Sequence, residues 1–233
     1  MRIDAHQHFT PQHPPEHLKP ILARNRFDGS IVVGDDPGEF AHDFVRGVVR
    51  RVDWNRLDEC RKSPLFRGVL HSLDDGIPAA FAELVRRGIP VDLQMGPHQL
   101  PMLRRIAESV PELRMAIDDL ANPSFGSPMT DEWARGMEAA AQLPQVFCKA
   151  SNLLEHAPAP WKAADIRPYV QHALAVFGPR RMMFGSGWPS CLPAAGWKET
   201  LAAFTQCIGA QTMEVREELL GGTAARFYGL DGI

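Results

Sequence analysis

Two histidines near the start of the chain, His6 and His8, have a spacing that suggests chemistry. They follow a short run, residues 2–5, that predicts a first buried strand. Side chains alternate faces along a strand, so His6 and His8 point to one side and Gln7 to the other. Two imidazoles at one strand end can bind a divalent metal or an oxyanion. The alternative is a polar strand end whose histidines are solvated.

More polar side chains stand at the ends of strands predicted further along the chain. They are His71, Gln94, the pair Asp118 and Asp119, and Lys149. A lysine in a buried strand is costly unless it is paired, so Lys149 predicts an ion-pair partner or a substrate group that it orients. The alternatives are a strand-end lysine that reaches solvent and, for His71, a hydrogen-bonded histidine with no role in chemistry.

These side chains belong to a regular alternation of strands and helices. Apolar runs predict eight strands, near 2–5, 31–33, 44–52, 66–71, 91–95, 114–118, 146–151 and 182–186. Helical spacing of apolar residues lies between most of them, which implies a parallel sheet, and eight such units close a (β/α)₈ TIM barrel. An open doubly wound sheet is the alternative, but no glycine-rich phosphate motif follows the first strand. In a barrel, catalytic groups lie at the carboxyl ends of the strands, where the polar residues above are found.

One edge of the predicted barrel is short. The strand near 31–33 is followed almost at once by the strand near 44–52, although parallel neighbours usually need a dozen or more residues and a helix between them. We therefore predict an α/β barrel trimmed around its second helix, with a helix-poor segment at 34–43. The whole chain, 1–233, is predicted to be one domain.

Composition narrows the class of protein. The chain is 45% hydrophobic, with a net charge of −3 and a pI near 6.3, which favours a globular protein and not one that binds nucleic acid or an anionic membrane. No apolar run approaches a membrane span and no basic-then-apolar leader opens the chain. The four cysteines, which lack metal-finger spacing, are expected to be free thiols in a reducing cytoplasm: Cys60, Cys148, Cys191 and Cys207. A small-molecule substrate and a homo-oligomer are both compatible with this composition.

Four motifs resemble one known family. IDAHQHF at 3–9, CKAS at 148–151, FGSGWP at 184–189 and GGTAARFYGL at 221–230 are similar, in the same order, to the amidohydrolase-related (amidohydrolase 2) family. The most similar branch is that of fuconolactonase-like sugar lactonases within the TIM-barrel metal-dependent hydrolases. The resemblance implies a barrel that hydrolyses a small lactone, with a divalent metal such as zinc held at the paired histidines.

Two positions depart from the family pattern. Where the resembled enzymes carry Asp-His after the sixth strand, this chain has Asp118-Asp119. Where they end the eighth strand in Ser-Asp-Trp-Pro, it has Gly187, so the family's general base and metal ligand is missing. Asp119 is the first candidate to replace it, and the acidic residues of the trimmed edge are the others: Asp35, Asp36 and Asp53.

Three functions remain open. The first is a hydrolase of a small lactone or related cyclic ester, of low activity, in which Asp119 and His71 act in catalysis, Lys149 and Gln94 bind substrate, and His6 and His8 hold a metal. The second is an inactive barrel that binds a sugar acid, and the third is a decarboxylase of the same superfamily. Because two histidines supply fewer ligands than a catalytic zinc usually has, we expect zinc to be weakly held or absent. We also expect Gly187→Asp to raise hydrolase activity, because the motif on both sides of Gly187 is retained.

Overall fold

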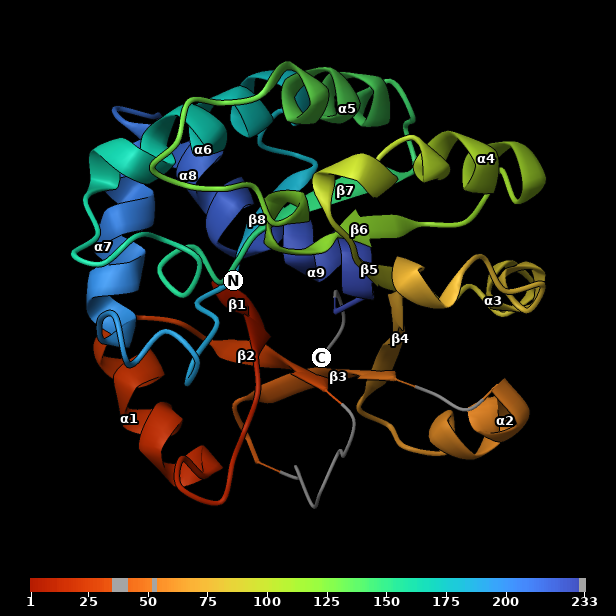
Figure 1. Ribbon diagram of the computed structural model, residues 1–233. Helices are drawn as coiled ribbons and strands as arrows, with labels where there is room; N and C mark the ends of the chain where they lie inside the picture. Colours follow the sequence, from red (N-terminus) through yellow and green to blue (C-terminus); the bar gives the residue numbers. More distant parts are fainter. Residues whose placement is uncertain (35–41, 52–53, 231–233) are drawn as a thin grey trace.

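The computed structural model describes residues 1–34, 42–51 and 54–230 (Figure 1). Within them lie eight strands: β1 Ile3–Gln7, β2 Gly29–Gly34, β3 Val45–Arg51, β4 Phe66–Ser72, β5 Val91–Gln94, β6 Met115–Ile117, β7 Val146–Ala150 and β8 Met182–Phe184. The α-helices of the same residues are α1 Pro15–Arg24, α2 Leu57–Cys60, α3 Phe81–Arg86, α4 Met102–Ser109, α5 Asp131–Ala141, α6 Ala163–Phe177, α7 Trp197–Ile208, α8 Met213–Glu217 and α9 Thr223–Tyr228.

The strands form one parallel sheet in the order of the sequence, β1 to β8. The sheet closes on itself between the end of β1 and the residues that follow β8. Gln7 is bridged to Trp188, the amide of Gly187 donates to the carbonyl of His6 at 2.9 Å, and the amide of His8 donates to the carbonyl of Trp188 at 2.9 Å. The predicted TIM barrel is confirmed, and Figure 1 shows the strands in the centre with helices around them.

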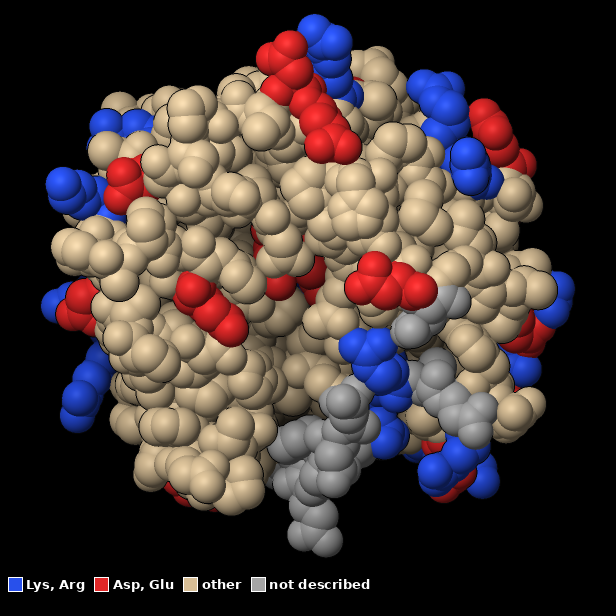
Figure 2. Space-filling model, viewed as in Figure 1, with Lys and Arg blue, Asp and Glu red and all other residues tan. Residues whose placement is uncertain are grey.

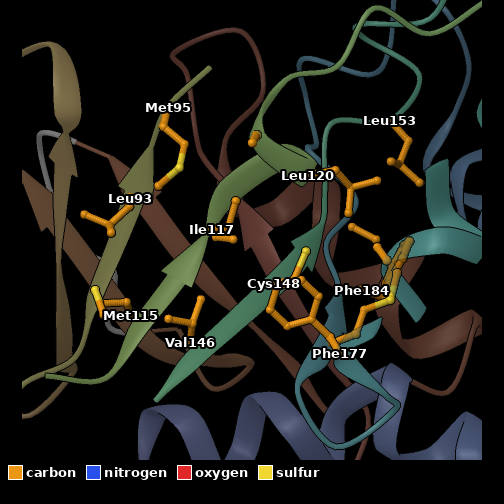
Figure 3. Packing of buried hydrophobic residues seen from close by; sticks show 14 of the residues in the cluster. Leu93, Met95, Met115, Ile117, Leu120, Val146, Cys148, Leu153, Phe177 and Phe184 are labelled. Atoms are coloured by element: carbon orange, nitrogen blue, oxygen red, sulfur yellow. The ribbon is translucent and has the colours of Figure 1, made fainter. Parts of the chain in front are cut away.

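The apolar core has two parts, as a barrel requires. The larger part lies between the strands and the surrounding helices, and Figure 3 shows a section of it with Leu93, Ile117 and Cys148 on neighbouring strands. The smaller part fills the inside of the barrel and includes Ile3 and Met183 together with side chains of α9. Alternate strand residues therefore face opposite layers, and only those near the carboxyl ends of the strands are left to build a site.

Helix α5 illustrates how local sequence fixes these elements. Thr130 precedes the helix and its hydroxyl accepts a hydrogen bond from the amide of Trp133 at 3.3 Å, which caps the first turn. Asp131 and Glu132 place negative charge at the positive end of the helix dipole. Trp133 and Met137, four residues apart, are buried against the barrel.

A charged cluster is buried inside the barrel below the carboxyl ends of the strands. The Lys149 ammonium contacts the Asp92 carboxylate and lies 3.1 Å from Asp118 Oδ1, and all three side chains are fully buried. The Tyr228 hydroxyl donates to both Asp92 oxygens, at 3.0 and 2.8 Å. Burial alone lowers the pKa of Lys149, but Asp118 and Asp92 outweigh it and raise that pKa well above its usual range. Lys149 is therefore a cation shared by two carboxylates.

Removing the Tyr228 hydroxyl tests how much this cluster contributes to the free energy of unfolding. We expect Tyr228→Phe to lower the free energy of unfolding by about 1–3 kcal/mol, because a buried carboxylate loses a donor while the ring and its packing stay. Tyr169→Phe is the matched control, since the Tyr169 hydroxyl donates only to the backbone carbonyls of Ser124 and Ser127. Urea unfolding measures both, and equal losses in the two variants would contradict the prediction.

The edge predicted to be trimmed is only partly visible. Of the helix-poor segment 34–43, residues 35–41 lie outside the described residues, as does Asp53. On either side of this segment, β2 ends at Gly34 and β3 begins at Val45. In the described part of the chain no helix is long and apolar enough to cross a membrane.

Candidate active site

A cavity of about 670 Å³ opens at the carboxyl ends of the strands. Among the described residues it is lined by His6, His8, Val33, Gly34, Arg51, Leu70, Ser72, Asp74, Gln94, Met95, Gly96, His98, Gln99, Asp119, Asn122, Asn152, Glu155, His156 and Ser190. Figure 2 shows this face, with acidic side chains in and around the central hollow. The cavity lies where a TIM barrel carries its chemistry.

Asp119 reaches the cavity because the backbone after β6 takes an unusual course. Four successive residues, Asp119 to Asn122, have positive φ angles of 54°, 53°, 59° and 50°. Each costs a side-chain-bearing residue of the order of 1 kcal/mol, so other contacts must hold the turn. Trp133 Nε1 donates to the carbonyl of Leu120 at 2.7 Å, and Asn122 Nδ2 donates to the carbonyl of Met95 at 3.1 Å. A strained turn fixed in this way points to a functional role for Asp119.

Two side chains that follow β7 hold the Asp119 carboxylate. The Ser151 hydroxyl donates to Oδ1 at 2.6 Å and accepts from the Asp119 amide at 3.2 Å. Asn152 Nδ2 donates to Oδ2 at 3.1 Å. Each carboxylate oxygen thus has one fixed donor and keeps a lone pair for another partner. Asp119 is therefore oriented as a base or a substrate acceptor would need to be.

The Asn152 side chain also explains why residue 187 is glycine. Gly187 has a φ of 67°, and a Cβ added there would lie 1.8 Å from Asn152 Oδ1. Asn152 therefore occupies the space that a side chain at position 187 would need. This geometry corrects the assumption behind the Gly187→Asp prediction, because the retained flanking motif does not leave room for the new carboxylate.

His6 and His8 both line the cavity, from the end of β1. His6 Nδ1 lies 3.9 Å from Asp118 Oδ2, and neither atom has a hydrogen-bond partner among the described residues. Burial, helped by Lys149, lowers the pKa of His6 to about 3, and burial also lowers the pKa of His8. Burial raises the pKa of Asp118 well above its usual range, although Lys149 opposes this shift. Two neutral imidazoles beside the Asp119 carboxylate can donate or accept single protons at neutral pH.

The low pKa of His6 makes a prediction about stability. Below pH 6.5 the unfolded chain takes up a proton on this residue that the folded chain does not, so the free energy of unfolding falls, by up to about 1.4 kcal/mol per pH unit. We expect chelator-treated His6→Asn to lose less stability than the parent protein between pH 6.5 and 4.5. His17→Asn, at an exposed helix position, is the control. Urea unfolding across this range measures the slopes, and parallel slopes for parent and His6→Asn would contradict the prediction.

The other predicted site residues lie at different distances from the cavity. Gln94 lines it, and its Oε1 accepts a hydrogen bond from Arg51 Nη2 at 2.7 Å. Lys149 lies below it in the buried cluster. His71 faces the helical layer, with Nε2 2.8 Å from the carbonyl oxygen of Gly76 and its ring packed against Phe81. Neither Lys149 nor His71 lines the cavity in the described part of the chain, so we assign them no contact with substrate.

The donor set does not fit a catalytic zinc with three protein ligands. Within residues 1–34, 42–51 and 54–230, no three His, Cys, Asp or Glu side chains converge on one point. One oxygen of Asp118, the acid nearest His6, is held by Lys149, and the amide of Asn152 fills the space beside Gly187. The mechanism proposed below therefore uses protein side chains alone. Weak or absent zinc binding stays a prediction.

Comparison with known proteins identifies the class. The model of the amidohydrolase family matches residues 39–230, and the chain belongs to this family. The L-fucono-1,5-lactonase of Burkholderia ambifaria is 28% identical in an alignment that covers 99% of this chain and 96% of the relative. These relationships support a hydrolase of the amidohydrolase superfamily.

Solved structures agree with this class. Two crystal structures of an amidohydrolase from Burkholderia multivorans, one with bound HEPES and one with bound zinc, match with a TM-score of 0.87 at 26% identity, over 98% of this chain and 99% of that one. A 2,6-dihydroxybenzoate decarboxylase from Rhizobium matches with a TM-score of 0.65 at 12% identity over 99% of each chain. At that identity the decarboxylase shares the fold alone.

Sequence reasoning missed one residue that lines the cavity, Asn152, and one buried acid near it, Asp4. Asn152 follows the CKAS motif directly, but nothing in its local pattern shows that it reaches both Asp119 and Gly187. Asp4 was also missed: it is fully buried and accepts hydrogen bonds from the Ser186 amide and Trp197 Nε1, each at 2.8 Å. Asp4 could have been singled out from the sequence, because an acid two residues before His6 in a buried strand needs hydrogen-bond partners.

Proposed function

We propose that the chain hydrolyses a neutral, hydroxyl-bearing cyclic ester, with a sugar 1,5-lactone as the model substrate. The observation that carries the proposal is the Asp119 carboxylate, fixed by Ser151 and Asn152 in a cavity that it shares with His6 and His8. The Asp119 side chain supplies a base and the two imidazoles supply N–H donors, which water attack on an ester requires. The similarity to L-fucono-1,5-lactonase supports the same chemistry.

The charges of the cavity favour a neutral substrate. Its described lining contains three carboxylates, Asp74, Asp119 and Glu155, but one permanent cation, Arg51. Such a lining repels a dicarboxylate, whereas sugar hydroxyls can donate to the carboxylates and accept from Arg51 or Gln94. Hydrophobic area is contributed by few lining residues, which also suits a polyol.

In the proposed mechanism Asp119 is the general base. It takes a proton from water while the water oxygen bonds to the lactone carbonyl carbon and the carbonyl electron pair moves onto its oxygen. The N–H groups of neutral His6 and His8 donate to this oxyanion. The ring C–O bond then breaks, the leaving alkoxide takes the proton from Asp119, and an open-chain hydroxy acid is released.

A panel of 1,5- and 1,4-sugar lactones, followed with a pH indicator in chelator-treated and zinc-supplemented protein, tests the proposal. We expect hydrolysis of neutral lactones well above the buffer rate and little hydrolysis of lactones that carry additional carboxylates. Metal analysis of untreated protein runs beside it, since near-stoichiometric zinc would contradict the prediction of weak binding. Binding of a sugar acid without hydrolysis of any lactone would overturn the proposal in favour of a non-catalytic barrel.

A further inference from the structure

A second cavity, of about 420 Å³, lies at the opposite end of the barrel from the candidate active site. It is bounded by residues at or just before the starts of β4, β5 and β6, and by the end of α9. Because all the strands are parallel, this is the amino-terminal face. Four arginines line the cavity, and no acidic residue does so in the described part of the chain: Arg61, Arg67, Arg87 and Arg114.

Two of these arginines have acidic neighbours outside the cavity. Arg87 contacts both Asp58 and Glu83, and Arg61 Nη1 lies 4.0 Å from the same Asp58. Glu83 is also paired with Arg86, so these two carboxylates are shared among three guanidinium groups. Arg61 and Arg87 are still the two arginines of this cavity that have a carboxylate partner among the described residues.

The other two arginines contact only neutral groups among the described residues. Arg67 Nη1 donates to the carbonyls of Pro64 and Phe66, at 2.7 and 3.0 Å. Arg114 donates to the carbonyls of Phe227 and Gly88, at 2.8 and 2.7 Å. Burial lowers the pKa of both guanidinium groups.

Arg67 has unused donors as well as unpaired charge. Its Nε is buried and lacks an acceptor within the described residues, although buried donors are nearly always paired. Its stem packs closely over Gly47, where an added Cβ would lie 2.5 Å from Arg67 Cγ, and its Nη1 is oriented by the two carbonyls. A fixed guanidinium with unused N–H groups is the usual receptor for a bidentate oxyanion.

We infer that this cavity is a binding site for a doubly charged oxyanion, such as a phosphate monoester or a small dicarboxylate. A dianion matches the two guanidinium charges, of Arg67 and Arg114, that lack a carboxylate. The ligand is distinct from the neutral substrate proposed for the active site, whose lining is acidic. The site would let such an anion bind while the active-site cavity at the other end of the barrel stays open.

Inorganic phosphate and malonate are the probes, each compared with sodium chloride at equal ionic strength. We expect both dianions to raise the melting temperature and to bind in isothermal titration calorimetry with one site per chain. Arg67→Gln should weaken binding at least about tenfold, since a charged hydrogen bond is lost. Arg135→Gln, at an exposed arginine on α5, should not change binding.

Asp119→Asn distinguishes the anion site from the active site. It should leave phosphate binding unchanged even if it abolishes hydrolysis. If Arg67→Gln is poorly folded, Arg114→Gln provides the same test at the second guanidinium group that lacks a carboxylate partner among the described residues. Equal weak responses of the parent, Arg67→Gln and Arg135→Gln would show general ionic effects and overturn the proposal. No response of the parent protein to either dianion would overturn the proposal too.

Discussion

Replacing Asp119 by asparagine is expected to lower kcat/KM for lactone hydrolysis by 10²- to 10⁴-fold, the range that a positioned general base contributes. Asparagine has nearly the same volume, so the turn at 119–122 and the contacts with Ser151 and Asn152 can persist. The amide cannot accept a proton from water at neutral pH, and the proposed mechanism stops at its first step.

Steady-state rates on the best lactone of the panel measure this loss. Asp131→Asn is the matched control, because Asp131 is an exposed acid at the start of α5, paired with Arg135 and remote from the cavity. Far-UV circular dichroism and urea unfolding show whether Asp119→Asn is folded. An Asp119→Asn protein that is folded and as active as the parent would place the base elsewhere.

The fold was predictable from the sequence because its signals are local and repeated. Apolar runs of strand length alternate with helical spacing, and each unit can be recognised without its neighbours. The positions of His6 and Asp119 at strand ends followed from the same argument. The periodicity of apolar residues does not predict how the chain continues beyond the end of a strand. The site lies in these segments, and tertiary contacts determine their conformation.

Asn152 and Lys149 show this limit. The sequence gives no sign that the backbone at Asp119 turns left-handed, so it could not predict that Asn152 meets the carboxylate. Lys149 was predicted to need a partner, which is correct, but its partners, Asp92 and Asp118, come from two other strands. The alternation of side chains along a strand predicts that a lysine faces the inside of the barrel. It does not predict whether that lysine reaches the cavity or lies below it.

The second large effect is expected at Gly187. We predict that Gly187→Ala lowers the free energy of unfolding by roughly 2.5–5 kcal/mol. The positive φ of 67° accounts for about 1–2 kcal/mol of this. The rest arises because the new Cβ displaces the Asn152 side chain, which loses its hydrogen bond to the Asp119 carboxylate, a charged bond worth about 1.5–3 kcal/mol.

Gly229→Ala separates these two causes. Gly229 is left-handed, with φ 63° and ψ 50°, and a Cβ added there has nothing within 4 Å, so this variant reports the cost of a left-handed backbone alone. We expect Gly187→Ala to be clearly less stable than Gly229→Ala in urea unfolding. Equal losses would mean that Asn152 moves aside freely.

The Gly187 prediction is decided by a double-mutant cycle with Asn152→Gly. Removing the Asn152 side chain makes room at position 187, so the double variant should be more stable than the sum of the two single losses predicts, by at least about 1 kcal/mol. For the same reason Asn152→Gly with Gly187→Asp should hydrolyse lactones faster than Gly187→Asp alone, since the new carboxylate then has space beside His6. Additive losses of stability would contradict the idea that the two positions share one space. A cycle that couples in stability while every variant lacks hydrolysis would keep the packing argument and reject the proposed chemistry.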